Sequence, residues 1–318
     1  MIGAGFLGTH TVRRLHGDDI AVRVLTRSTV ESEKQVRLGP AEIVVADASV
    51  QGVVGAALDG VDHVFYCAGG LMPAQSNLDP ATDAALALPP LLRVLEELRT
   101  RRDVGFTFLS SGGTIYGNPQ RIPVTEDDPT EPLTSYGIMK LTGEKYVLMF
   151  RKLYGIPARI LRCSNAYGPF QPEDRGQGFV ATALRRLFDG APITLFGDGM
   201  NIRDYVYAPD VADVMLRLAQ AHDGPAVLNV GSGRGTTLCE LLRQLEVVAG
   251  REPVISREPD RGFDVREIVL DIARLQRTVP FAPTPLEDGL FQTVAAFDED
   301  GARRQTAGSG PARPRDGH

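Results

Sequence analysis

The sequence lacks tryptophan, has only three cysteines and contains no apolar run of the length that crosses a membrane. A membrane-spanning helix needs about 20 consecutive apolar residues, and the first residues do not read as a secretory signal. Cys67, Cys163 and Cys239 are far apart and form no Cys-x-x-Cys pair or Cys/His cluster, which argues against a disulfide framework and against a metal site. We therefore expect a cytoplasmic protein with buried free thiols and no membrane association.

The chain is also short of positive charge. It has 34 lysines and arginines against 40 acidic residues, a formal net charge of −6, and no basic stripe that would neutralise the phosphates of a nucleic acid. We expect no nucleic-acid partner. The 318 residues are 43% hydrophobic, which is ample for the core of one large α/β domain or of two modest ones.

Short β-rich runs alternate with helical stretches through the first half of the chain. Helix-spaced apolar residues fill 89–100 and 135–154. Buried strands separated by helices indicate an α/β fold with a doubly wound parallel sheet of the Rossmann type, covered on both faces. The predicted strands are residues 20–26, 41–47, 62–69, 104–111 and 156–163.

The pattern loosens after about residue 168 into connections rich in proline and glycine. We expect a dinucleotide-binding domain over 1–168 and a smaller C-terminal substrate-binding lobe over 169–300. Residues 301–318 are polar, rich in glycine and proline and without periodicity, which is typical of a disordered tail.

Glycines near the N-terminus have the spacing of a loop that binds the pyrophosphate of a dinucleotide. Gly3, Gly5 and Gly8 precede or open a helix with an apolar face, and such a loop presents backbone amides and a helix N-terminus to phosphate. Only Met1 and Ile2 come before it, about five to six residues fewer than a usual buried strand needs. We expect the first strand to be truncated in the chain as written, through a start codon assigned too late or an engineered truncation.

A tyrosine and a lysine four residues apart are candidates for the chemistry. Tyr136 and Lys140 fall in the predicted helix over 135–154, where this spacing puts the phenol and the ammonium on one face. A nearby ammonium favours the phenolate form, which makes the tyrosine a usable proton-transfer group, and lysine can also hold a ribose hydroxyl. On spacing alone, a solvated surface pair remains the alternative.

The motifs around this pair resemble the extended short-chain dehydrogenase/reductase family. The segment "FTFLSSGGTIYGNPQRIPVTEDDPTEPLTSYGIMKLTGEKY" resembles the nucleotide-sugar epimerase/dehydratase branch, which includes the UDP-glucose 4-epimerases, and "LRCSNAYGPFQP" is similar to a further motif of that branch. The resemblance is close from about residue 104 to 170, and a weaker similarity continues to about residue 298.

The resemblance implies roles for individual residues. Tyr136 matches the acid/base tyrosine of the family, and Lys140 matches the lysine that binds the cofactor ribose. Asp47 matches an acidic residue that can bind the adenine amino group. The pyrophosphate loop corresponds to Gly3, Gly5, Phe6, Leu7 and Gly8, although the usual first glycine of the family falls on Ile2. The positions that hold the nucleotide diphosphate of the substrate correspond to Asn165, Arg203 and Arg261.

One departure from the family pattern concerns the hydroxyl that assists the tyrosine. The family usually has a serine or threonine four residues before the tyrosine that is Tyr116 here, and position 112 is glycine. Ser111 and Thr114 are the nearest hydroxyls. We expect one of these two to polarise the C4 oxygen of the sugar, and the sequence does not choose between them.

A second departure concerns the cofactor. An NAD-selective site usually has Asp or Glu after the second strand, to accept from the adenosine ribose hydroxyls. Here Thr26 is followed by Arg27 and Ser28, so a repelling carboxylate is missing and Arg27 offers a guanidinium to a 2′-phosphate. The sequence leaves NAD and NADP open.

The leading interpretation is an NAD(P)-dependent nucleotide-sugar 4-epimerase that acts on a UDP-hexose through a transient 4-keto sugar. The alternatives are an NADP-dependent reductase of a nucleotide-linked 4-keto sugar, and an impaired remnant that serves as a binding or regulatory subunit. A 4,6-dehydratase is less favoured, because Gly113 and Thr114 stand where that enzyme has adjacent acidic residues for elimination. The resemblance also implies a homodimer whose four-helix interface is formed by residues 88–100 and 135–154.

Overall fold

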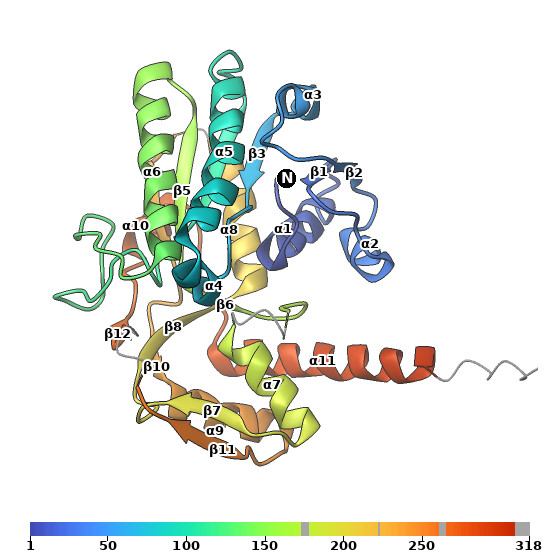
Figure 1. Ribbon diagram of the computed structural model, residues 1–318, viewed down its shortest axis with the longest axis vertical. Coiled ribbons are helices and arrows are strands. Elements are labelled where there is room, and N and C mark those ends of the chain that lie inside the picture. The colour runs from blue at the N-terminus through green and yellow to red at the C-terminus, as the bar shows by residue number, and fades with distance from the viewer. Residues whose placement is uncertain (173–177, 222, 261–264, 309–318) are drawn as a thin grey trace, which may run out of the picture.

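The computed structural model describes residues 1–172, 178–221, 223–260 and 265–308. Figure 1 shows two lobes, with the parallel sheet and its helices in one and a smaller α/β lobe beneath. Among the described residues, no helix combines the length and apolar character needed to cross a bilayer.

The larger lobe is built on a parallel sheet, as the alternating pattern predicts. β1 pairs with β2, and β3, β4, β5 and β9 pair in that order, all in parallel. Each of the five predicted strands contains one of the observed ones, so the doubly wound fold is confirmed. The bounds are β1 (Arg23–Thr26), β2 (Glu42–Val45), β3 (His63–Tyr66), β4 (Gly105–Ser111), β5 (Ala158–Cys163) and β9 (Val227–Val230).

Residues 1–3 join the two parts of this sheet. Ile2 forms parallel bridges to Leu25 in β1 and to Tyr66 in β3. Its amide donates to the Phe65 carbonyl (2.9 Å), and the Gly3 amide donates to the Leu25 carbonyl (3.1 Å). These few residues therefore occupy the central position of the sheet, as an isolated bridge rather than as a full strand.

Helices cover both faces of the sheet because side chains alternate along each strand. Phe65 packs into a core with helices α1 and α8, whereas its neighbours Val64 and Tyr66 pack into a second core with α3, α5 and α6. Helix α5 begins before the predicted 89–100. Asp79 caps its start at the Thr82 amide, and Pro89 and Pro90, the first residues of the predicted segment, lie inside the helix. The bounds are α1 (Phe6–His16), α2 (Ser32–Leu38), α3 (Val53–Ala57), α4 (Pro73–Leu78), α5 (Pro80–Leu98), α6 (Ser135–Tyr154) and α8 (Ala208–Gln220).

The smaller lobe has two short sheets and its own apolar core. β8 pairs with β10, β12 and β6, and β11 pairs with β7. Leu184, Leu195, Tyr205, Leu241 and Leu290 are among the buried residues of this core. The bounds are β6 (Asn165–Tyr167), β7 (Ile193–Phe196), β8 (Ile202–Tyr207), β10 (Gly235–Thr237), β11 (Ile255–Glu258), β12 (Glu267–Ile268), α7 (Phe179–Asp189), α9 (Leu238–Ala249) and α11 (Leu286–Gly308). Helix α10 (Ala273–Thr278) packs with the larger lobe, where its Leu275 is buried in the same core as β9.

The chain does not stay within one lobe after residue 168, where we expect the boundary between the two domains. Helix α8 packs on α1, and β9 adds to β5 at the edge of the large sheet. The chain therefore returns to the first lobe over 208–230 before it re-enters the second. Helix α11 continues to Gly308, into the segment for which we expected no regular structure, and residues 309–318 lie outside the described part.

Candidate active site

The glycine loop leads from residues 1–3 into α1. Gly3 has φ +84°, and a Cβ atom placed on it would lie 2.7 Å from the Ala68 backbone nitrogen. A Cβ atom on Gly8 would lie 2.3 Å from the Gly3 carbonyl oxygen, so these two glycines are required by the folding of the loop itself. Gly5 is different, because a Cβ atom there would meet nothing within 4 Å. The absence of a side chain at Gly5 leaves room for a ligand.

The N-terminus of α1 has the properties of an anion site. Gly5 is its N-cap residue and supplies no side chain, and the described first turn holds no acidic residue. The first intrahelical bond to Gly5 comes from the Thr9 amide (2.9 Å), so the amides of Phe6 and Leu7 point out of the helix end. These amides fit the pyrophosphate of a dinucleotide, and the open space at Gly5 would let that group come close to them.

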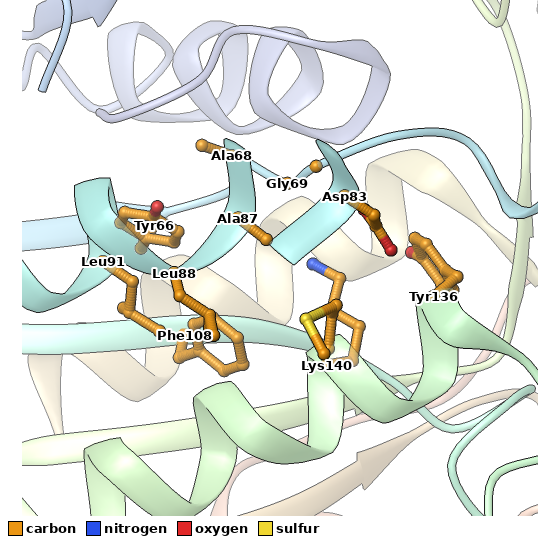
Figure 2. A pocket seen from close by; sticks show the side chains of 12 residues that line it. Tyr66, Ala68, Gly69, Asp83, Ala87, Leu88, Leu91, Phe108, Tyr136 and Lys140 are labelled. Atoms are coloured by element: carbon orange, nitrogen blue, oxygen red, sulfur yellow. The ribbon is translucent and has the colours of Figure 1, made fainter. Parts of the chain in front are cut away.

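Tyr136 and Lys140 line a small cleft beside the carboxyl ends of β3 and β4. The Lys140 ammonium donates to the Leu109 carbonyl (2.9 Å) and lies 5.8 Å from the centre of the Tyr136 ring. In Figure 2 this ammonium points toward the loop that carries Ala68 and Gly69. The cleft is lined by Tyr66, Ala68, Gly69, Gly70, Asp83, Ala87, Leu88, Leu91, Phe108, Tyr136, Met139 and Lys140.

The N-terminus of α6, which carries Tyr136, is closed by side chains. Thr134 caps the helix by accepting from the Gly137 amide (3.2 Å). The Ser135 amide donates to Asn77 Oδ1 (2.8 Å), and the Tyr136 amide donates to Ser76 Oγ (3.1 Å). The backbone at Tyr136 is therefore fixed from α4.

The segment after β4 explains the glycine at position 112. A Cβ atom on Gly112 would lie 2.5 Å from Leu270 Cδ1 and 2.9 Å from the Arg162 carbonyl oxygen. A side chain at this position would therefore collide with packed groups. Ser111 ends β4, and the Thr114 carbonyl oxygen lies 3.0 Å from where a Cβ atom on Gly137 would stand, next to Tyr136.

Two buried polar atoms near this segment have no hydrogen-bond partner among the described residues. They are Thr114 Oγ1 and Asn165 Nδ2. Gly113 lies beside Asn165, whose Oδ1 is 3.4 Å from a Cβ atom placed on that glycine. A buried polar group without a partner costs about 1–3 kcal/mol, so these atoms are suited to meet a polar ligand.

The predicted diphosphate ligands are only partly described. Arg203 lies in β8, where its guanidinium donates to the Ile202 carbonyl (2.9 Å) and more distantly to the Arg266 carbonyl (3.4 Å). It is half-buried and retains part of its surface for solvent or a ligand. Arg261 lies outside the described residues.

The two candidates for the adenosine end stand at the carboxyl ends of neighbouring strands. Asp47 follows β2 and accepts from the Ser49 amide (2.8 Å), and Arg27 follows β1 as an exposed residue. The hydrogen bonds from Ser49 lower the pKa of the Asp47 carboxyl, and the positive charge of Arg27 lowers it further. The carboxyl ends of β1 and β2 thus carry one positive and one negative side chain.

Sequence reasoning missed a buried polar network beneath the site. Glu144 forms an ion pair with Arg162 (2.7 Å) and accepts from Ser110 Oγ (2.5 Å). Arg162 also donates to the Tyr116 hydroxyl (2.9 Å). The spacing of four from Lys140 to Glu144 was a usable signal, because it continues the Tyr136 face of the helix by one more turn.

The remaining polar clusters give no sign of a metal centre. Within the described part of the chain, no group of three His, Cys, Asp or Glu side chains is placed to hold a metal ion. The cysteines are free, with Cys163 buried and Cys67 and Cys239 half-buried.

Comparison with known proteins identifies the family. Residues 2–231 match the NAD dependent epimerase/dehydratase family. The UDP-glucose 4-epimerase of Mycolicibacterium smegmatis is 31% identical over 304 residues, which cover 92% of this chain and 96% of that protein.

Two solved structures share the fold over almost the whole chain. The UDP-glucose 4-epimerase of Thermotoga maritima with UDP-glucose is 32% identical, with a TM-score of 0.87 and coverage of 94% of this chain and 98% of that one. The UDP-glucose 4-epimerase of Thermus thermophilus in complex with NAD is 30% identical, with a TM-score of 0.85 and coverage of 94% and 99%. The chain therefore belongs to the NAD-dependent epimerase/dehydratase family of extended short-chain dehydrogenases/reductases, and it is an enzyme with a nicotinamide dinucleotide cofactor.

Proposed function

We propose that the protein is a nucleotide-sugar 4-epimerase that acts on a UDP-hexose. The observation that carries the proposal is the Tyr136–Lys140 pair, which lines a cleft at one edge of the sheet. The uncapped N-terminus of α1 lies at the same edge. The relatives named UDP-glucose 4-epimerase support the choice of reaction and of nucleotide.

Tyr136 is the proton-transfer group of this proposal. The C4 carbon of the sugar loses a hydride and its hydroxyl loses a proton, which leaves a 4-keto sugar. When bound, NAD(P) would accept this hydride and later return it. Tyr136 holds the proton, Lys140 orients the ribose, and the proton returns when the other face of C4 is reduced.

The residues around the sugar have complementary roles in the proposal. Thr114 is the better-placed hydroxyl for the C4 oxygen, because its Oγ1 is buried with no hydrogen-bond partner among the described residues and its backbone abuts α6. Ser111 remains the second candidate at the end of β4. Asn165, Arg203 and Arg261 hold the diphosphate, a task that suits the fork of a guanidinium.

The protein would work as a homodimer through α5 and α6. Ile138, Met149 and Leu153 are exposed on α6 at spacings of 11 and 4 residues, which put them on one face. A second copy would cover this apolar face with its own two helices. Size-exclusion chromatography with light scattering should give twice the chain mass at micromolar concentration, and a Leu153→Glu variant should give the monomer mass.

Incubation with a panel of UDP-, dTDP- and GDP-hexoses, read by NMR, tests the proposed reaction. We expect interconversion of a UDP-hexose and its C4 epimer with no net consumption of cofactor. A reductase of a 4-keto sugar, which the exposed Arg27 at the end of β1 favours through NADPH binding, would instead consume one NADPH for each product formed. Protein that lacks both activities and bound nicotinamide would be a binding remnant and would refute the proposal.

A further inference from the structure

Asp83 is a buried carboxylate with no role in the reaction described above. It lies in the first turns of α5, is 1% exposed and lines the cleft together with Tyr136 and Lys140. In Figure 2 its carboxylate is directed to the end of the cleft where Tyr136 stands. A carboxylate removed from water must be satisfied by donors, and the identity of its donors indicates what it does.

One oxygen of Asp83 holds the loop that follows β3. Oδ1 accepts from the Leu71 amide (2.8 Å), and a Cβ atom on Gly70 would lie only 2.1 Å from the same oxygen. The loop therefore lies directly on the carboxylate, and any side chain at position 70 would displace it. A Cβ atom on Gly69 would stand 3.9 Å from the Lys140 ammonium, so the same loop borders the cofactor-binding lysine.

The other oxygen of Asp83 holds the first turn of α6. Oδ2 accepts from Ser135 Oγ (3.1 Å), and Ser135 is the neighbour of Tyr136 in the sequence. The amides of Ser135 and Tyr136 are bound by Asn77 and Ser76 of α4. Helix α4 thus fixes the backbone of this turn, whereas Asp83 connects the turn to the loop after β3.

We propose that Asp83 is a positioning residue that sets the distance between Tyr136 and the loop after β3. The proposal rests on the proposed function, because C4 can lose its hydride while its hydroxyl loses the proton only if the tyrosine and the cofactor keep one separation. A displacement of about 1 Å at such a site costs about a hundredfold in rate. Asp83 acts through Ser135 and Leu71 and does not itself touch the reacting atoms.

Three variants test the positioning role by kinetics. Asp83→Ala removes both bonds and should lower kcat at least tenfold, with KM for the nucleotide sugar and Kd for the cofactor changed less than about threefold. Asp83→Asn keeps an oxygen for the Leu71 amide and a group that can bond to Ser135, and should retain at least about a third of kcat. Asp79→Ala is the matched control, because Asp79 caps the same helix at Thr82 and should leave kcat unchanged.

A measurement without substrate separates this proposal from the proposed function. In protein labelled with ring-¹³C tyrosine, Tyr136→Phe identifies the Tyr136 resonance, and Asp83→Ala should shift that resonance more than those of the other tyrosines. If Asp83→Ala does not fold, Ser135→Ala takes its place, since it removes only the hydroxyl. An unmoved Tyr136 signal, or equal loss of kcat in Asp83→Asn and Asp83→Ala, overturns the positioning role. A moved signal in a protein without epimerase activity supports it and refutes the proposed reaction.

Discussion

The N-termini of α1 and α6 lie in the same lobe and are built in opposite ways. At α1 the cap is Gly5, the described first turn has no side-chain cap, and the space at the cap is open. At α6 the amides of Ser135, Tyr136 and Gly137 are all taken by side chains. One helix end keeps its amides available for a ligand, whereas the other uses them to immobilise its own first turn.

In the proposed function, the difference follows from the task of each end. A helix end that binds phosphate must leave its donors unsatisfied, because the favourable charge lies in the free N–H groups. A group that transfers a proton must be held within about 0.5 Å of its working position. Satisfying the α6 amides removes a binding site and provides rigidity at Tyr136.

Removal of the phenol hydroxyl tests the α6 end and should have the largest effect. Tyr136→Phe should lower turnover by about 10²–10⁴-fold, because it deletes the proton acceptor while the ring and its packing remain. The melting temperature and the cofactor content should stay close to wild type. Lys140→Ala should in addition weaken cofactor retention, because in the proposed function Lys140 also orients the ribose. A Tyr136→Phe enzyme that keeps most of its activity would remove this residue from the mechanism.

Making α1 resemble α6 should have the next largest effect. Gly5→Asp supplies the missing cap in a position with free space, and should leave the fold at least as stable. The new carboxylate would occupy the place of the pyrophosphate, and like charges brought together cost several kcal/mol, so we expect cofactor affinity to fall about a hundredfold. Isothermal titration with NAD and NADP measures the loss.

Gly5→Asn is the matched control for that substitution, because it has the same shape without the charge. The excess loss in Gly5→Asp over Gly5→Asn reports the repulsion of phosphate alone. Wild-type affinity in both variants would show that the dinucleotide does not approach this helix end.

The diphosphate of the substrate should bind away from both helix ends, and its arginines should show a smaller effect. Arg203→Ala and Arg261→Ala should each raise KM about tenfold or more, on the order of 1.5–3 kcal/mol for the loss of a charged donor. Cofactor affinity should not change in either variant, which distinguishes them from Gly5→Asp. An unchanged KM in both would place the diphosphate elsewhere.

The α1 end is built from residues close in sequence, whereas the α6 end depends mainly on residues far from it in sequence. The glycine spacing and the Tyr136–Lys140 spacing depend on residues close in sequence, and the alternation of β-rich runs with helical stretches located five strands of the sheet. Thr134, which caps the Gly137 amide, is local, but the side chains that bind the Ser135 and Tyr136 amides and the Ser135 hydroxyl come from residues 77, 76 and 83, more than 50 positions earlier. No periodicity reports such long-range contacts.

The sequence did not predict the return of the chain to the first lobe, because this path also depends on long-range contacts. Among the described strands, β9 pairs only with β5, which lies more than 60 residues earlier in the sequence. Its sequence is as apolar as that of a strand in either lobe, so composition could not assign it. A single boundary at residue 168 treats each lobe as one continuous segment, whereas residues 208–230 pack with the first lobe.

An N-terminal extension should have the smallest effect, and it acts on the strand position that aims the α1 loop. The Met1 amino group donates to the Arg23 carbonyl (2.7 Å), and burial lowers its pKa from 8.0 to about 6. The charged amine is thus disfavoured in the folded state. Its penalty is full below about pH 6 and vanishes above about pH 8, so this group makes stability rise with pH across that window.

Addition of about six β-branched, apolar residues before Met1 replaces the amine with a peptide amide and offers further strand to β1 and β3. A shift of two pKa units corresponds to about 2.7 kcal/mol, so the extended protein should melt a few degrees higher at pH 6. At pH 8.5 the amine is largely neutral in both states, and removing it should no longer raise the melting temperature. A Gly/Ser extension of equal length is the control, because it removes the charged amine without adding a strand. A gain in melting temperature at pH 8.5 that only the apolar extension gives would report added strand pairing. The burial of His10 and His63, which lowers the pKa of each to about 4, affects both proteins alike and cancels in the difference. Equal melting temperatures at both pH values, with equal shifts on addition of NAD or NADP, would show that the three residues before Ala4 already suffice to aim the loop.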